Sequence, residues 1–203
     1  MNVITNFQKK HGLVADGIIG KNTLLKIKEV YRIPTLEATA HFMGNAHHES
    51  GGFKILEENL NYSADGLFKI FKKYFPTLEI AKQYARKPEA IANKVYGGRM
   101  GNVDEGDGWK FRGRGVMQTT GKTNYKLLGD FLDVDLVENP DLVKSDYALE
   151  SAVFYFNSNG LWGKASKVDD DTIKKIRKAV NGGYNGLDDV ANKVRYYYQL
   201  MNK

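Results

Sequence analysis

Two glutamates, Glu49 and Glu58, are the residues whose type and spacing most suggest chemistry. They lie nine positions apart in the stretch HHESGGFKILEENLNYS, residues 47–63. Glu49 is expected at the C-terminal end of a helix, where the helix dipole and unpaired carbonyl groups disfavour a negative charge and so favour the protonated form. Glu58 follows a glycine turn, in a polar stretch that could reach back across a cleft. Such a pair suits glycoside hydrolysis, in which an acid protonates the leaving oxygen and a base activates water.

Other chemistries can be read from the same stretch. His41 and His48 share one helical face beside Glu49, which suggests a metal site, but the HExxH spacing is missing because glycines follow. Packed or hydrogen-bonded histidines are the simpler expectation, and no metal site is predicted. Ser50 lacks the G-x-S-x-G elbow of serine hydrolases. From spacing alone, Glu49 could also be an ordinary solvated residue at a helix end.

The stretch WKFRGRGVMQTTGKTNY, residues 109–125, is also rich in residues that could bind a substrate. Its glycines allow close approach of the backbone, and its two arginines can bind carboxylates or sugar oxygens. Gln118, Thr119 and Thr120 add neutral donors and acceptors, so the inventory suits a carbohydrate cleft. A single RGRG in a periodic apolar context indicates a structural turn more than an RNA-binding tract. The P-loop pattern of nucleotide-binding proteins is absent.

The elements that must position these residues are predicted to be helices. Pro34 and Thr35 suit a helix start, and the helix that they begin is expected to end at Gly51 and Gly52. Further helical patterns cover residues 65–74, 77–86, 88–96, 123–131, 146–158, 171–180 and 187–201. No stretch sustains an alternation of apolar and polar residues. The fold class is therefore mainly α, with room for one short β-hairpin near residues 95–119.

The N-terminal segment, residues 1–34, is predicted to form a helical hairpin. Within it, FQKKHGLVADGIIGKNT resembles the second half of a small peptidoglycan-binding module found on cell-wall hydrolases, but the first half of that module is missing. So short a segment could hardly bury a core of its own. We therefore expect a single catalytic domain over residues 1–203, made of the hairpin and a core at residues 35–203.

The composition indicates a folded protein without cysteine chemistry. Of the 203 residues, 42% are hydrophobic and 12% aromatic, which argues against disorder. The absence of cysteine excludes disulfides, thiol nucleophiles and cysteine-based zinc sites. A formal net charge of +6 favours encounter with polyanions, although the basic residues are spread along the chain. Because no apolar run could span a bilayer and the N-terminus lacks a secretory signal, we expect synthesis in a cytoplasm.

Four blocks of the sequence, in order, resemble a known enzyme family. AHHESGGFKILEENLNYS, KVYGGRMGN, GDGWKFRGRGVMQTTGKTNY and NGGYNGLDD are similar to the characteristic blocks of glycoside hydrolase family 19, in particular its bacteriophage endolysin branch. The resemblance covers roughly residues 35–190, and the combination is far more specific than any single block. It implies a bilobal, mostly helical, lysozyme-like fold related to that of plant-type chitinases.

The resemblance also implies an inverting acid/base mechanism. Glu49 falls at the position of the general acid, and Glu58 at that of the base. Thr120 falls at the position of a hydroxyl that helps to hold the attacking water. Inversion would need the two carboxyl groups about 6.5 to 9.5 Å apart, so that the water fits between them. The loop carboxylates of Asp104, Glu105 and Asp107 are an alternative source of the base, although solvated loop charges are the simpler interpretation.

Further positions of the family pattern suggest contacts to the sugar chain. The substrate-binding positions implied in this way are Gln118, Asn124, Tyr125 and Asn181. Arg112 and Arg114 are expected to brace the cleft and tune the carboxylates. Tyr62 is expected either in the cleft or in the core, because a buried tyrosine needs only one partner for its hydroxyl.

These implications predict a phage endolysin that hydrolyses β-1,4 glycosidic bonds of bacterial peptidoglycan and so lyses the host cell. Such an enzyme would need no cofactor or metal, bind no nucleic acid, insert stably into no membrane and act as a monomer. It would stay in the host cytoplasm until a separate holin pore opened the way to the periplasm and the cell wall.

Three alternatives remain open at this stage. The first is a chitinase acting on N-acetylglucosamine polymers, because one fold can serve both substrates. The second is a catalytically silent protein that binds peptidoglycan. The third is membrane disruption by the basic helix DTIKKIRKAV, residues 171–180, whose apolar face more commonly packs on a core.

Overall fold

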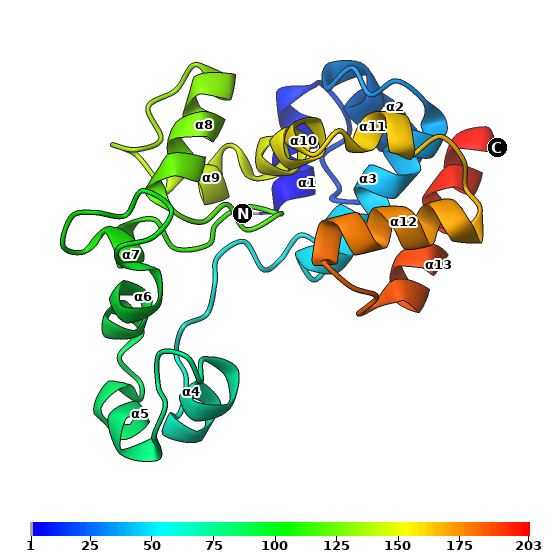
Figure 1. Cartoon of the computed structure of the whole chain (residues 1–203). Helices are drawn as coiled ribbons and strands as arrows, with labels where there is room; N and C mark the ends of the chain where they lie inside the picture. Colours follow the sequence, from blue (N-terminus) through cyan, green and yellow to red (C-terminus); the bar gives the residue numbers. More distant parts are fainter. Residues whose placement is uncertain (1) are drawn as a thin grey trace. The chain divides into compact units, whose positions relative to one another are not determined.

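The computed structural model describes residues 2–203 and is mainly α-helical, which confirms the predicted fold class (Figure 1). The chain divides into two compact units. Unit 1 combines the residues up to Leu56 with Tyr147–Lys203, and unit 2 is Glu57–Asp146. No helix within residues 2–203 is long and apolar enough to cross a membrane.

Unit 1 is built around helix α3. Its helices are α1 (Val3–Lys10), α2 (Lys21–Val30), α3 (Leu36–Glu49), α10 (Ala148–Ser158), α11 (Leu161–Lys164), α12 (Asp170–Asn181) and α13 (Leu187–Asn202). Helix α3 packs most extensively against α13, and α2, α10 and α12 also contact it. Helices α3 and α13 approach closely at Gly44, where an added Cβ would lie 2.6 Å from Cγ2 of Val194. Helix α3 is therefore the buried centre of the unit, and Glu49 is its last residue.

Both ends of α3 follow the sequence prediction. The Thr35 hydroxyl accepts a hydrogen bond from the Ala38 amide at 3.0 Å, as expected for an N-terminal cap. After Glu49 the chain turns through Gly51 and Gly52, whose φ angles of 54° and 78° lie in the left-handed region. The Gly52 amide donates to the carbonyl of His47 at 2.8 Å, which closes the last turn.

Unit 2 contains the remaining helices. They are α4 (Ala64–Ile70), α5 (Leu78–Tyr84), α6 (Pro88–Tyr96), α7 (Asp107–Lys110), α8 (Lys122–Leu132) and α9 (Leu142–Ser145). A cluster of buried apolar side chains, the unit 2 core cluster, holds α4 to α6 together. Its members are Leu60, Leu67, Phe75, Ala81, Ile91, Ala92 and Val95. Helix α7 packs on α6 through Gly108, where an added Cβ would lie 2.6 Å from the Ala92 carbonyl oxygen.

The longer helices agree with the prediction, and the short ones do not follow from the sequence pattern. Helix α6 has the predicted bounds, α8, α10, α12 and α13 differ from theirs by one or two residues at an end, and α4 and α5 are shorter. Helices α7, α9 and α11 were not predicted, because four-residue helices are too short to show a period. Helices α1 and α2 lie in the segment predicted as a hairpin, and the predicted division into residues 1–34 and 35–203 stays a prediction.

In place of the short hairpin expected near residues 95–119, unit 2 has two isolated antiparallel bridges. Arg114 pairs with Thr119, and Glu57 pairs with Arg114. The Arg114 amide donates to the Thr119 carbonyl at 3.1 Å, and the Thr119 amide returns a bond to the Arg114 carbonyl at 2.8 Å. The Glu57–Arg114 bridge holds the stretch that contains Glu58 against the glycine-rich stretch that follows Phe111.

Candidate active site

Glu49 ends helix α3 in unit 1 and is paired with a buried arginine. Its Oε1 accepts a hydrogen bond from Nη1 of Arg177 on α12. The Arg177 side chain is 1% exposed, whereas that of Glu49 is 27% exposed. Nε of Arg177 donates to the Asn185 carbonyl at 2.7 Å, so the guanidinium group is fixed at two points. Glu49 is thus anchored on one side and open to solvent on the other.

This ion pair modifies the electrostatic expectation for Glu49. The helix end disfavours a second negative charge, as predicted, but the guanidinium of Arg177 attracts that charge. Tyr155 lies in the same region, and its hydroxyl donates to the carbonyl groups of Ala179 and Val180, both at 3.2 Å. Burial, and then the negative charge of Glu49, raise the pKa of Tyr155, so this hydroxyl stays neutral.

Asn181, a predicted sugar contact, also belongs to unit 1. It is the last residue of α12 and is exposed, and Gly182 ends the helix with a φ of 74°. Because Arg177 lies four residues earlier on the same helix, the two side chains share one face. The structure therefore places the predicted residues Glu49 and Asn181 in unit 1, with Arg177 contacting Glu49.

Glu58 lies in unit 2, beside the glycine-rich stretch. Its amide donates to the Gly113 carbonyl at 2.9 Å, and the Gly113 amide faces its Oε2 at 3.5 Å. Oε1 accepts a hydrogen bond of 2.6 Å from the hydroxyl of Tyr96, the last residue of α6. Both donors that bind this carboxylate among residues 2–203, the Tyr96 hydroxyl and the Gly113 amide, are neutral.

Gly113 is the point at which three predicted site residues converge. A Cβ added there would lie 2.6 Å from Oε1 of Gln118, 3.2 Å from Oγ1 of Thr120 and 3.4 Å from Cβ of Glu58. The Thr120 hydroxyl donates to the Gln118 carbonyl at 2.9 Å, which leaves its oxygen free to accept. Unit 2 thus brings Glu58, Gln118 and Thr120 together around Gly113, where an added Cβ would force the Gln118 side chain to move.

The neighbouring Glu57 belongs to a separate ion-pair network that includes both arginines of the RGRG motif. Arg112 and Lys144 bind its carboxylate, and Nε of Arg114 lies 3.5 Å from it. Burial acts to raise the pKa of Glu57, but the hydrogen bond from Lys144 and the charges of the three basic residues hold it below its ordinary value. Arg112 also stacks on the Trp109 ring at 3.7 Å. The arginines therefore brace Glu57 and the loop.

Two further predicted sugar contacts, Asn124 and Tyr125, begin helix α8. Tyr125 is fully buried; its hydroxyl donates to the Arg112 carbonyl at 2.7 Å and accepts from Nη1 of Arg114 at 2.9 Å. Asn124 is exposed, and its amide nitrogen donates to the Thr120 carbonyl at 2.7 Å. Tyr125 supports the RGRG loop from behind, and direct contact of either side chain with a sugar stays a prediction.

Tyr62 is half-buried and close enough to sense the charge of Glu58. Its ring packs edge-on against Phe71 at 5.3 Å, next to the unit 2 core cluster. Burial, and then the negative charge of Glu58, raise the pKa of Tyr62. Its ring therefore packs on the core, and a role of Tyr62 in the cleft stays a prediction.

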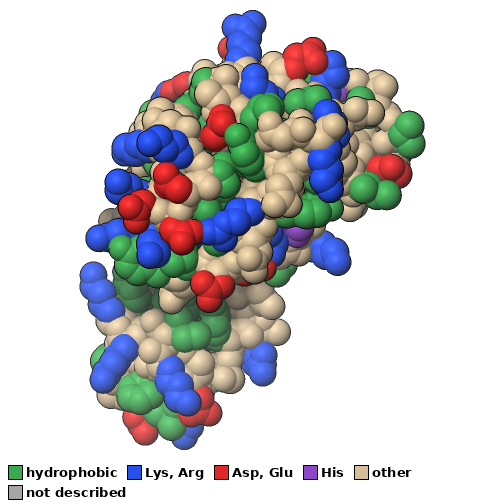
Figure 2. Space-filling model, turned by 90° about the vertical axis from the view of Figure 1, so that its right-hand side faces the viewer, with side chains coloured by type: hydrophobic (Ala, Val, Ile, Leu, Met, Phe, Trp, Pro, Cys, Tyr) green, Lys and Arg blue, Asp and Glu red, His purple; other side chains and the backbone are tan. Residues whose placement is uncertain are grey.

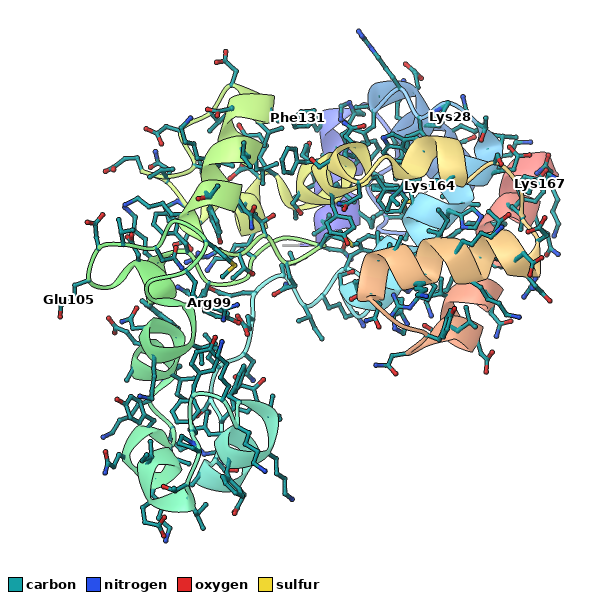
Figure 3. All side chains as sticks on the ribbon, in the orientation of Figure 1. Lys28, Arg99, Glu105, Phe131, Lys164 and Lys167 are labelled. Carbon is teal, nitrogen blue, oxygen red and sulfur yellow. The ribbon has the colours of Figure 1, made fainter. Side chains whose placement is uncertain are left out.

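The loop carboxylates considered as alternatives to Glu58 have other surroundings. Asp104 and Asp107 both pair with Lys122, at 2.6 and 3.2 Å. Figure 3 shows Glu105 at the outer edge of the loop between α6 and α7, pointing away from the helices of unit 2. These contacts favour Glu58 as the base.

The histidines that suggested a metal site have protein partners instead. His41 is buried, and its Nε2 lies 2.8 Å from the Lys167 carbonyl oxygen. His48 lies 2.6 Å from Oδ2 of Asp189. Within residues 2–203, the structure contains no group of three or more potential metal-binding side chains.

Comparison with known proteins identifies the family to which these residues belong. The profile of glycoside hydrolase family 19, described as chitinase class I, matches residues 35–169. The chain belongs to this family. A "glycosyl hydrolase family 19 domain-containing protein" of Haemophilus influenzae is 42% identical over 164 residues, which cover 80% of this chain and 78% of the relative. The family 19 chain is thus a chitinase-like glycosidase.

More distant relatives agree with this assignment. "Chitinase 11" of rice, Oryza sativa subsp. japonica, is 50% identical over 48 residues, or 23% of this chain and 19% of the rice protein. The crystal structure of chitinase C from Streptomyces griseus superposes with a TM-score of 0.54 at 18% identity, covering 100% of this chain and 94% of the other. At that identity the superposition shows a shared fold.

Sequence reasoning missed the two residues that hold the carboxylates. Arg177 lies in the basic amphipathic helix and Tyr96 in the block KVYGGRMGN, but the sequence predicted no role for either residue. Each is far from its glutamate along the chain, 128 residues for Arg177 and 38 for Tyr96. A signal existed for Arg177, because an arginine on the apolar side of a helix requires a buried anion or carbonyl partner.

Proposed function

We propose that this family 19 glycosidase is an endolysin that hydrolyses β-1,4 bonds of bacterial peptidoglycan with inversion at the anomeric carbon. The observation that carries the proposal is the grouping of Glu58, Thr120 and Gln118 around Gly113, which suits activation of a water molecule. Glu49, which is held by Arg177, supplies the complementary acid. Glu49 belongs to unit 1 and Glu58 to unit 2.

In the proposed mechanism, the unit 2 residues hold and deprotonate the water. Oε2 of Glu58 accepts one proton of the water, while Tyr96 holds Oε1 in place. The Thr120 hydroxyl already donates to the Gln118 carbonyl, so its oxygen accepts the second hydrogen of the water. With both hydrogens committed, a lone pair of the water oxygen is left to attack the anomeric carbon.

The unit 1 residues complete the reaction by giving a proton to the leaving sugar. Arg177 binds Oε1 of Glu49, so Oε2 is the oxygen that can deliver a proton to the substrate. When that proton passes to the glycosidic oxygen, Glu49 becomes negative and the buried guanidinium stabilises it. The ion pair therefore favours proton transfer in the direction that hydrolysis requires.

The choice of peptidoglycan as substrate is supported by charge and by the four sequence blocks of the endolysin branch. A net charge of +6 favours approach to an anionic envelope. Figure 2 shows Lys and Arg side chains scattered among Asp and Glu over the face in view, as expected for general attraction to an envelope rather than for one nucleic-acid groove. We further propose action as a monomer, release from the host cytoplasm through a holin pore, and then attack on the wall from the periplasm.

The second candidate is a chitinase, because the similar rice protein and the structurally similar Streptomyces griseus protein are both chitinases. The two candidates differ in the sugar released.

Purified peptidoglycan and chitin oligosaccharides are digested with the wild type and with Glu49→Gln, and the soluble products are reduced and weighed by mass spectrometry. Peptidoglycan fragments with a reduced N-acetylmuramic acid end, absent with the variant, support the endolysin. Cleavage of chitin oligosaccharides without release from peptidoglycan contradicts it and supports the chitinase.

A further inference from the structure

The loop Tyr96–Asn102, here called the YGGRMGN loop, touches both parts of the water-activating group in unit 2. At its start, the Tyr96 hydroxyl donates to Oε1 of Glu58 at 2.6 Å. At its end, the side-chain oxygen of Asn102 accepts from the Lys122 amide at 2.8 Å, and Lys122 lies two residues after Thr120. The loop therefore contacts the proposed base and the segment that carries the proposed water-holding hydroxyl.

Asn102 joins these two ends through a buried side chain that is 1% exposed. Its amide nitrogen donates to the Tyr96 carbonyl at 3.0 Å, while its backbone carbonyl accepts from the Gly98 amide at 2.7 Å. The loop is thus closed on itself by the same side chain that binds the start of α8. A shift of Tyr96 would be transmitted to Lys122 through one asparagine.

The loop also fits closely against the residues that follow Thr120. A Cβ added to Gly121 would lie 2.4 Å from Cβ of Met100, and one added to Gly101 would lie 2.3 Å from Oγ1 of Thr123. The Thr123 amide donates to the Met100 carbonyl at 3.0 Å. Glycine on each side permits this contact, which leaves little freedom for the segment that carries Thr120.

The Tyr96 side chain is anchored by the core of unit 2. It ends α6 and packs against the unit 2 core cluster, so its hydroxyl is presented from a rigid helix. Burial, then the hydrogen bond and the charge of Glu58, raise the pKa of Tyr96 far above its ordinary value. The other charged and titratable groups that act on Tyr96 are Tyr62 and Arg99. Tyr96 is therefore a neutral donor near neutral pH.

We infer that the YGGRMGN loop is the positioning element for the attacking water, and that Tyr96 is the positioning residue for the base Glu58. A neutral hydroxyl fixes the direction of the carboxylate without cancelling the negative charge that it needs as a base. Asn102 keeps the segment that carries Thr120 in a fixed position relative to the Glu58 carboxylate. The inference rests on the proposed roles of Glu58 and Thr120.

The test compares Tyr96→Phe with Tyr84→Phe and Glu58→Gln on whichever of purified peptidoglycan and chitin oligosaccharides the wild type cleaves. Tyr84 is the matched control, because its ring packs on Phe75 beside the same core cluster. For Tyr96→Phe, kcat is expected to fall about 10- to 100-fold with KM nearly unchanged, the range for a hydrogen bond to a charged group. The acidic limb of its pH profile should move to higher pH, because the carboxylate loses a donor.

The outcomes separate this inference from the proposed function. An inactive Glu58→Gln, a slowed Tyr96→Phe with a displaced acidic limb and an unchanged Tyr84→Phe support the loop as positioning element. Wild-type kcat and pH profile in Tyr96→Phe, beside an inactive Glu58→Gln, overturn the role of Tyr96 while the base assignment survives. Full activity of Glu58→Gln overturns the base assignment, and the inference with it.

Discussion

The two units hold their candidate carboxylates by opposite means. In unit 1, Glu49 sits at a helix end and is bound by the fully buried guanidinium of Arg177. In unit 2, Glu58 lies outside the helices and is bound by a tyrosine hydroxyl and a glycine amide. A positive partner stabilises the anion that a proton donor leaves behind, whereas neutral partners orient a carboxylate and leave its charge available. The difference fits an acid in unit 1 and a base in unit 2.

The largest effect is expected from removing either carboxylate. Glu49→Gln and Glu58→Gln should each lower kcat about 10²- to 10⁴-fold, because each removes one proton-transfer group. Product release from the cleaved polysaccharide measures the loss. Glu29→Gln, an exposed position of unit 1, serves as control and should retain wild-type activity. A variant of Glu49 or Glu58 that kept full activity would remove that residue from the mechanism.

The same two variants should lose different amounts of stability, because the two units hold their carboxylates differently. Glu49→Gln leaves the buried Arg177 guanidinium without its anion and should cost about 1–3 kcal/mol in the free energy of unfolding. Glu58→Gln should cost less than about 1 kcal/mol, because the amide oxygen can still accept from the Tyr96 hydroxyl. Denaturant unfolding measures both values. Equal losses would show that the two carboxylates are held alike.

Gly113→Ala tests whether unit 2 depends on close packing at the site. The new methyl group would lie 2.6 Å from Oε1 of Gln118 and 3.2 Å from Oγ1 of Thr120, so both side chains must move. We expect kcat to fall about tenfold, in line with misplacement of a catalytic group. Gly163→Ala is the matched control, since a Cβ there meets nothing within 4 Å. Wild-type kinetics in Gly113→Ala would contradict the grouping around this glycine.

A small pH effect is expected from Glu57, the ion-paired neighbour of Glu58. Its pKa in the folded chain lies below the ordinary 4.5, so its stabilising contribution is complete above that value and is lost as pH falls through the lowered pKa. Because the side chain is 30% exposed, the contribution should stay below about 1 kcal/mol. Between pH 6 and about pH 3, the free energy of unfolding should fall less steeply in Glu57→Gln than in the wild type. Glu105→Gln, on the outer loop, should match the wild type.

The sequence predicted local features well and long-range partners poorly. Helix α3, its Thr35 cap and its glycine stop follow from neighbouring residues and were confirmed. The convergence at Gly113 depends on a reversal between Arg114 and Thr119 that has no strand periodicity. The residues that hold the carboxylates, Arg177 and Tyr96, meet them only after folding. Propensity and periodicity report local structure, whereas these contacts are products of tertiary packing.

The measurement that tests the central claim most directly is the stereochemistry of the first product. The wild type is mixed with a β-1,4-linked substrate in an NMR tube, and the anomeric proton of the new reducing end is recorded before mutarotation. An acid in unit 1 and a water-activating base in unit 2 predict the α-anomer as the initial product, because the water attacks opposite the leaving group. An initial β-anomer would mean retention and would contradict the assignment of Glu58 and Thr120 to the attacking water.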